Sequence, residues 1–77
     1  MSGIIAYIGK EEACPIIIDG LRRLEYKGYD SAGILLFEKN NFKCFKTKGK
    51  LINLELELSD EHFFSHIGMG HTRWATH

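Results

Sequence analysis

The first nine residues place the strongest constraint on how this chain folds. Met1 to Gly9 form an almost continuous apolar run with glycines near both ends, a pattern typical of a buried strand. A chain end is normally polar and frayed, so an apolar strand that carries the terminus into a core suggests that the terminus has a role of its own. Taken alone, an ordinary first strand is the commoner explanation of such a stretch.

A small hydroxyl residue follows the initiator methionine. Small second residues generally permit removal of Met1, which would leave Ser2 with a free α-amine beside its side-chain oxygen. The unperturbed pKa of an α-amine, roughly 7.7 to 8.0, suits a general base near neutral pH, and N-terminal nucleophiles use their own amine in this way. Ser2 is therefore a candidate nucleophile.

Length, charge and cysteine content exclude several classes of protein. Seventy-seven residues form at most one small domain, and ten basic residues balance ten acidic ones. No net field attracts nucleic acid or an anionic membrane, so neither is expected as a partner. No apolar run, Ile16 to Ile18 included, is long enough to cross a bilayer. Cys14 and Cys44, without a secretory signal, indicate reduced thiols in the cytoplasm.

The next segment predicts a helix that packs one face on a sheet. Apolar residues recur at helical spacing, at positions 14, 17, 18, 21 and 24. Pro15 is tolerable only in the first turn, and Gly28 marks the end of the helix. Gly20 lies inside the helix, where it costs stability, so we expect it to allow a close backbone approach.

Two strands and their turn are predicted after the helix. Residues 31–37 are apolar on both alternating faces, which is typical of a central strand covered on both sides. Asn40 and Asn41 are a tight-turn signal, so residues 42–48 are expected to return antiparallel as a hairpin. Lysines at 43, 46 and 48 indicate an edge or a solvated end.

The last third of the chain is less clearly patterned. Residues 51–58 fit both a strand and a helix, and we favour the helix. Residues 66–71 predict another strand, whose glycines permit close packing or a bulge. Residues 72–77 form no finished element, which is typical of a truncated chain.

Two further groups of residues could carry chemistry. Residues 23–33 crowd two tyrosines, a lysine and an aspartate into a turn between helix and strand, although a well hydrogen-bonded turn explains them as well. Residues 70–77 combine Arg73, Trp74, Thr76 and His77. A guanidinium binds a carboxylate bidentately, hydroxyls add hydrogen bonds and the indole closes the pocket. The alternative is a surface loop with a stacked arginine and tryptophan.

A metal site is the least supported alternative. His62 and His66 lie four residues apart, and Cys14, Cys44, His71 and His77 could supply further ligands. The chain has no Cys-x-x-Cys pair, and ordinary surface histidines are the commoner explanation. We therefore expect no metal and no cofactor.

Three segments, in this order and spacing, resemble a known family. They are residues 2–9, residues 23–33 and residues 70–77, and together they look like the glutaminase domain of glutamine:fructose-6-phosphate aminotransferases, the glucosamine-6-phosphate synthases. The resemblance covers residues 1–77 as the N-terminal portion of a class II glutamine amidotransferase domain. The rest of that domain and the two sugar-isomerase domains of the family are absent from this sequence.

The resemblance implies an α+β fold of the N-terminal-nucleophile hydrolase type, in which antiparallel sheets stack between helical layers and the nucleophile starts a central strand. It implies hydrolysis of L-glutamine to glutamate, with ammonia delivered to fructose 6-phosphate. Arg73 matches the residue that binds the α-carboxylate, Thr76 and His77 lie in the same substrate loop, and Trp74 matches the gate of the ammonia passage. The full-length family member is expected to be a cytoplasmic homodimer.

This sequence departs from the family pattern at three positions. Serine at position 2 replaces the nucleophilic cysteine, Ala6 replaces a glycine, and Lys27 replaces an arginine. Three explanations of Ser2 stay open: an engineered replacement that traps substrate, a natural serine nucleophile, and a decayed fragment without activity. Because of Ser2, and because the family's oxyanion hole lies beyond residue 77, we expect this chain to be inactive alone.

Two expectations can be compared with a structure. If the glutaminase interpretation is correct, Ser2 and the segment from Arg73 to His77 lie close together, because a nucleophile and a carboxylate clamp must converge on one small glutamine. The alternative function is a non-catalytic half-domain that pairs with other synthase segments, or with itself, through exposed strand edges.

Overall fold

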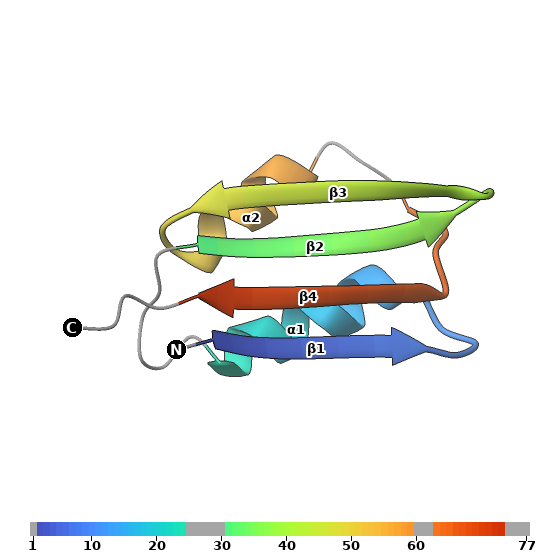
Figure 1. Ribbon diagram of the computed structural model, residues 1–77, viewed down its shortest axis with the longest axis horizontal. Coiled ribbons are helices and arrows are strands. Elements are labelled where there is room, and N and C mark those ends of the chain that lie inside the picture. Colours follow the sequence, from blue (N-terminus) through green and yellow to red (C-terminus); the bar gives the residue numbers. More distant parts are fainter. Residues whose placement is uncertain (1, 25–30, 60–62, 74–77) are drawn as a thin grey trace.

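The computed structural model describes residues 2–24, 31–59 and 63–73 (Figure 1). These residues form four strands and two helices. In chain order they are β1 (Ser2–Ile8), α1 (Ala13–Leu24), β2 (Ser31–Glu38), β3 (Asn41–Lys48), α2 (Leu51–Leu58) and β4 (Ile67–Arg73). The expected helix at 51–58 and the strand near 66–71 are both confirmed, and the strand extends to Arg73.

The four strands form one antiparallel sheet in the order β1-β4-β2-β3. The last strand of the described chain therefore lies between the first and second, and β1 and β3 are the edges of this sheet. Helices and antiparallel strands in one compact unit confirm the α+β class. Figure 1 shows the N-terminal start of β1 and the end of β4 at the same end of the sheet.

Both helices cover the same face of the sheet. α1 packs on β1 and β4, while α2 packs on β3 and β2 (Figure 1). Each helix buries residues at helical spacing, as its apolar periodicity requires. These are Ala13, Ile17 and Leu21 of α1, and Leu51, Leu54 and Leu58 of α2. We call this side of the sheet the helix face and the opposite side the open face.

Glycines on β4 let α1 approach the sheet closely. A Cβ atom on Gly70 would lie 2.6 Å from Cγ2 of Ile17, and one on Gly68 would lie 2.8 Å from Cδ1 of the same residue. On the helix itself, a Cβ on Gly20 would lie 3.0 Å from Cδ1 of Ile5. The expected roles of these glycines in close packing are confirmed.

The β2–β3 hairpin is confirmed, with its turn one residue earlier than expected. Lys39 and Asn40 have positive φ angles of 50° and 66°, whereas Asn41 already belongs to β3. Positive φ at both central residues is the geometry that matches the right-handed twist of the paired strands. The lysines of β3 lie on an edge strand, as their pattern predicted.

The segment before β4 is fixed by polar contacts at the other end of the sheet. Ser65 is 1% exposed, and its Oγ lies 2.6 Å from the carbonyl oxygens of both Phe37 and Ile67. The backbone N–H of Ala13, at the start of α1, donates to the Ser65 carbonyl at 2.7 Å. Ser65 therefore ties β2, β4 and α1 together.

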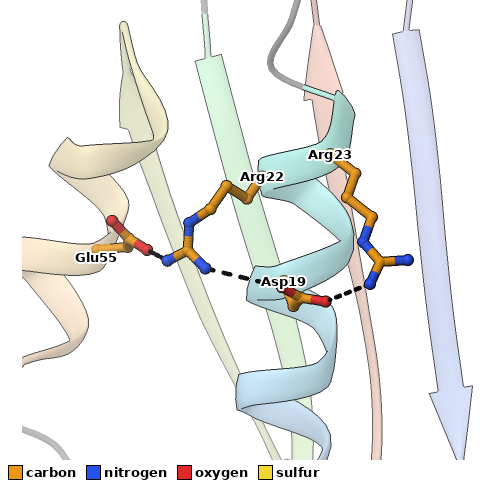
Figure 2. Close-up of polar contacts among 4 residues, drawn as sticks. All are labelled: Asp19, Arg22, Arg23 and Glu55. Carbon is orange, nitrogen blue, oxygen red and sulfur yellow. Dashed lines mark hydrogen bonds and ion pairs between the residues drawn. The ribbon is translucent and has the colours of Figure 1, made fainter.

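An ion-pair chain joins the two helices on the outside of the helix face. Figure 2 shows Arg22 of α1 between Glu55 of α2 and Asp19 of its own helix. Asp19 also pairs with Arg23 at 3.1 Å. All four side chains are at least partly exposed, so we attribute to them a small share of the stability.

Two burial predictions were wrong. β1 is a strand, but it is not buried, because Ile4 and Ile8 are 70% and 77% exposed. β2 lies inside the sheet as expected, yet Leu35 and Phe37 on its open face are only half-buried. The physical reason is the same for both strands: α1 and α2 cover one face, and no described element covers the other.

Two remaining expectations have different outcomes. Gly28, the expected end of the first helix, lies outside the described residues. None of the helices in the described part of the chain is long and apolar enough to cross a membrane.

Candidate active site

The beginning of β1, the end of β4 and the beginning of β2 meet at one end of the sheet. Cα pairing places Ser2 opposite Arg73, and Arg73 opposite Ser31 on its other side. Ser31 in turn pairs with Lys48 at the end of β3. By their backbone pairing these four residues form a row across the sheet, which we call the end row.

Arg73, Ser31 and Lys48 of the end row belong to the open face. Their neighbours in sequence, Thr72 on β4 and Ala32 on β2, are fully buried on the helix face. Side chains alternate between the two faces of a strand, so Arg73 and Ser31 are on the opposite side. Arg73 is exposed and its guanidinium is open to a ligand.

A second row of the open face lies directly behind the end row. It consists of Ile4, His71, Gly33 and Lys46. A Cβ on Gly33 would lie 2.8 Å from Nε2 of His71 and 3.2 Å from Cγ of Lys46, so both side chains extend over this glycine. His71 and Lys46 also line a shallow groove of about 380 Å³.

The open face carries basic side chains at this end and apolar ones at the other. Arg73, Lys46 and Lys48 are its charged residues within the described part of the chain, and none of its described positions is acidic. The other end carries Ile8, Ile67, Phe37 and Phe42. An anionic ligand group is therefore favoured near the end row and disfavoured elsewhere on this face.

On the helix face, at the same end of the sheet, the start of β1 is tightly packed. Thr72 is fully buried, and its hydroxyl has no hydrogen-bond partner among the described residues. A Cβ on Gly3 would lie 3.3 Å from the Thr72 hydroxyl oxygen and 2.8 Å from Cδ1 of Leu24. Glycine at position 3 thus lets the strand that carries Ser2 lie against α1 and β4.

The expected proximity of Ser2 and Arg73 is confirmed by their backbone pairing. Trp74, Thr76 and His77 lie outside the described residues, as do Lys27 and most of the predicted turn at 23–33. The segment 23–33 still contributes one residue, Ser31, to the end row. Ala6, the other departure from the family pattern, lies on β1 opposite Met69.

The structure adds residues that the sequence patterns did not single out. Lys48 joins the end row, and His71 is placed over Gly33 of the neighbouring strand. The hairpin turn at Lys39 and Asn40 determines the register that aligns Ser31 with Lys48. The tight-turn signal in the sequence could therefore have identified Lys48 as the partner of Ser31. The contact between His71 and Gly33 depends on the strand order, which no local pattern contains.

Of the residues considered for a metal site, His62 and His77 lie outside the described residues, and the described ones are spread over the fold. His66 is engaged at the other end of the sheet, where its Nδ1 lies 2.9 Å from the carbonyl oxygen of Glu11. Cys14 lies on α1, whereas Cys44 lies on β3. In the described part of the chain, no three histidine, cysteine or acidic residues are grouped to hold a metal ion.

Comparison with known proteins gives a consistent set of relatives. No protein-family model matches the chain. Over its whole length the chain is 54% identical to a glutamine-fructose-6-phosphate aminotransferase (isomerizing) of Clostridium tetani, and 52% identical to the enzyme of that name from Synechocystis. A third relative of the same name, from Bacteroides thetaiotaomicron, is 51% identical.

The chain spans 13% of the length of the Clostridium and Bacteroides relatives and 12% of the Synechocystis one. The matching portion is the N-terminal part of each relative. With identities of about half along all 77 residues, this chain is homologous to the N-terminal part of the isomerizing glutamine-fructose-6-phosphate aminotransferases.

Proposed function

We propose that residues 1–77 are the first portion of a class II glutamine amidotransferase domain. The observation that supports this most directly is the pairing of Ser2 with Arg73 at the end of two neighbouring strands. A nucleophile and a cation that serve one substrate must lie within the length of that substrate. Residues from almost opposite ends of the chain meet this requirement.

In the proposed reaction, residue 2 attacks the side-chain amide of L-glutamine, and its own α-amine accepts the proton of the nucleophile. Ammonia leaves, and water releases glutamate from the covalent intermediate. Arg73 binds the α-carboxylate of glutamine bidentately, which fixes the amide carbon in front of residue 2. Thr76 and His77 complete the substrate loop, and Trp74 gates the passage of ammonia.

The basic end of the open face suits this arrangement. Glutamine brings one carboxylate, and the end row offers Arg73 with Lys48 on the same row. The described part of this face carries no acidic group that would repel or displace the substrate carboxylate. We infer that the carboxylate enters from the open face.

The fold is proposed to be the first part of an N-terminal-nucleophile hydrolase domain. The uncovered apolar residues of the open face, among them Ile4, Ile8, Phe42 and Met69, are what a second packed sheet would bury. In the proposed complete protein, later residues supply that sheet, the oxyanion hole and the sugar-isomerase domains that use fructose 6-phosphate. We further propose that this complete protein is a cytoplasmic homodimer.

Serine at position 2 makes the chain inactive under this proposal. A thiol has an unperturbed pKa of about 8.5, close to that of the α-amine, so a cysteine gives up its proton at little energetic cost. A serine hydroxyl is much less acidic, and its oxygen is held farther from the carbonyl in a site shaped for sulfur. The loss of even one oxyanion donor costs about 100- to 1,000-fold in rate.

The test measures ammonia and glutamate release from glutamine by four proteins. Two are the 77-residue chain with serine or cysteine at position 2. The other two carry this segment in place of the matching part of the Clostridium tetani relative, again with serine or cysteine. We expect turnover only from the long protein with Ser2→Cys, and Arg73→Gln in that protein should raise KM for glutamine.

Two results would contradict the proposal. Rapid turnover by the short serine chain would show that neither sulfur nor the missing residues are needed. A long cysteine protein that folds but releases no ammonia would reject the assignment of residue 2, unless Lys27→Arg or Ala6→Gly restores its activity.

A non-catalytic half-domain is the second candidate function. It is favoured by the exposed apolar residues of the open face and by the edge of β1. Circular dichroism and size-exclusion chromatography of the isolated chain distinguish the two possibilities. A monomer that unfolds cooperatively would count against an obligate half-domain.

A further inference from the structure

Two buried hydroxyl groups have no hydrogen-bond partner in the part of the chain that the structure describes. They belong to Thr72 on β4 and Thr47 on β3, and both residues pair with Ala32 of β2. Ala32 is buried on the helix face, so the two threonines share that face. A buried hydroxyl without a hydrogen bond is costly, and such a group in a folded protein calls for an explanation.

The Thr72 hydroxyl lies beside the start of β1. Thr72 is fully buried and pairs with Gly3. A Cβ on Gly3 would lie 3.3 Å from the Thr72 hydroxyl oxygen, so this oxygen is turned toward the backbone of β1. Gly3 has no side chain to shield that backbone, and it is bonded directly to Ser2. The hydroxyl is therefore close to the residue proposed as the nucleophile.

Removal of Met1 would create a new polar group at this place. It converts the amide nitrogen of residue 2 into an α-amine, which has more N–H donors than the amide that it replaces. Standard bond lengths keep this nitrogen within about 5 Å of the Cα of Gly3. A direct hydrogen bond or one bridging water can span the separation from this nitrogen to the Thr72 hydroxyl. The amine thus offers the partner that Thr72 lacks among the described residues.

We propose that Thr72 is a positioning residue whose hydroxyl oxygen accepts a hydrogen bond from the α-amine of residue 2, directly or through one water. The inference rests on the proposed function in one respect, the use of that amine as the general base. With one N–H engaged by Thr72, the lone pair of the neutral amine is left to face the side chain of residue 2. An amine oriented in advance lowers the entropic part of the barrier to proton transfer.

Thr47 provides the matched comparison. Its hydroxyl is also buried and equally unpartnered within the described ranges, but β4 and β2 lie between its strand and β1. Removal of Met1 therefore brings no new donor to Thr47. Valine has nearly the shape of threonine and lacks the hydroxyl, so Thr72→Val and Thr47→Val each delete one buried polar group with little change in packing.

The experiment uses the 77-residue chain made by chemical synthesis, with and without Met1. In the form without Met1, an NMR titration measures the pKa of the α-amine of residue 2. A hydrogen bond that favours the charged amine raises this pKa, so Thr72→Val should lower it by about 0.5 to 1 pH unit. Thr72→Ser keeps a hydroxyl and should restore the original pKa. Thr47→Val should leave the pKa unchanged.

Urea denaturation of the same proteins gives an independent measurement. With Met1 present, Thr72→Val deletes a hydroxyl that has no described partner, so the urea midpoint should stay the same or rise. Without Met1, the same substitution breaks a hydrogen bond, and the midpoint should fall. Thr47→Val should have the same effect in both forms. If Thr72→Val does not fold, Thr72→Ala replaces it, because the cavity that alanine leaves is common to both forms.

The proposal is overturned by either of two results. One is an α-amine pKa that the Thr72 substitution leaves unchanged, or that Thr47→Val lowers equally. The other is an effect of the Thr72 substitution on the urea midpoint that is the same with and without Met1. Neither measurement uses glutamine, so this inference and the proposed function can fail separately.

Discussion

Ser2 and Arg73 are directly opposed on neighbouring antiparallel strands, although almost the whole chain separates them in sequence. Counting from the hydrogen bond between Gly9 and His66, they form a pair that does not exchange backbone hydrogen bonds. Such pairs have Cα atoms about 4.5 Å apart, the closer of the two antiparallel spacings. The proposed nucleophile position and the proposed carboxylate clamp are therefore adjacent before any substrate binds.

This adjacency can be tested by a disulfide. In a background with Cys14→Ser and Cys44→Ser, we expect the double variant Ser2→Cys, Arg73→Cys to form an intramolecular bond on mild oxidation. The expected Cα separation lies within the range of natural disulfides. The readout is a mass decrease of about two daltons that reductant reverses.

The matched control keeps one cysteine and moves the other. Ser2→Cys with Lys48→Cys places the thiols in the same row but on opposite edge strands, too far apart to bridge. Efficient intramolecular bonding in this control, or none in the test pair, would contradict the strand order.

Gly70→Ala should destabilise the fold by about 1 to 3 kcal/mol, because the new methyl group overlaps Ile17 and has the backbone oxygen of Gly33 behind it at 3.3 Å. Urea denaturation followed by circular dichroism measures the free energy of unfolding. Gly20→Ala is the matched control. Its methyl group would meet only the side chain of Ile5, and alanine favours the helix by about 1 kcal/mol, so a clearly smaller loss is expected.

Ser65→Ala should lower the free energy of unfolding by about 1 to 3 kcal/mol, because carbonyl groups of Phe37 and Ile67 would lose a buried hydrogen-bond donor. Ser59→Ala also removes a hydroxyl that donates to a carbonyl, that of Leu56, but at an exposed position. We expect this control variant to lower the free energy of unfolding by less than about 0.5 kcal/mol. Equal losses in the two variants would reject the linking role of Ser65.

The ion pair between Arg22 and Glu55 should contribute about 0.2 to 1 kcal/mol in a double-mutant cycle with Arg22→Ala and Glu55→Ala. The Arg22 side chain is 55% exposed, so water and salt screen the attraction. Repeating the cycle in about 1 M salt should reduce the coupling energy further. A coupling above about 2 kcal/mol would contradict the surface character of this pair.

The two thiols should differ in reactivity towards a disulfide reagent. Burial raises the pKa of the Cys14 thiol, and the nearby carboxylate of Glu12 raises this pKa further, whereas Cys44 is exposed on β3. The thiolate is the reactive form, so Cys14 should react more slowly near neutral pH and accelerate in alkali. Rates measured with Cys14→Ser and Cys44→Ser separate the two sites.

The raised pKa of the Cys14 thiol also affects the pH dependence of stability. A raised pKa means that the folded protein holds the thiol proton more tightly than the unfolded chain does. The contribution of Cys14 is therefore complete below the unfolded pKa of about 8.5 and decreases as pH rises through the higher folded value. Cys14→Ser should flatten this alkaline decline, and an unchanged pH profile would contradict it.

Local patterns predicted the elements well because each was determined by its own residues. The α1 periodicity, the lysines of β3 and the glycines of β4 all indicated features that the structure contains. The burial of β1 was predicted wrongly because exposure depends on what covers a strand. An apolar run does not say whether a second layer is present, and the described helices lie on one face alone.

The candidate site was predictable in part. The terminal position of Ser2 and the composition of residues 70–77 pointed to both ends of the site, and the strand register brings Ser2 and Arg73 together. The alignment of Lys48 with Ser31 follows from the local hairpin turn, whereas the contact of His71 with Gly33 depends on long-range strand order, which sequence spacing alone does not contain. The turn was displaced by one residue because both Asn40 and Asn41 tolerate positive φ.

The position of β4 between β1 and β2 also determines the order in which this sheet can assemble during synthesis. β1 is the first strand to leave the ribosome, yet its partner is the last described strand. The local β2–β3 hairpin can form early, whereas closing β1 onto β4 must bring together residues from almost opposite ends of the chain. The apolar first strand therefore stays unpaired with β4 until residues 67–73 have been synthesised, and exposed apolar strands are prone to aggregation during such an interval.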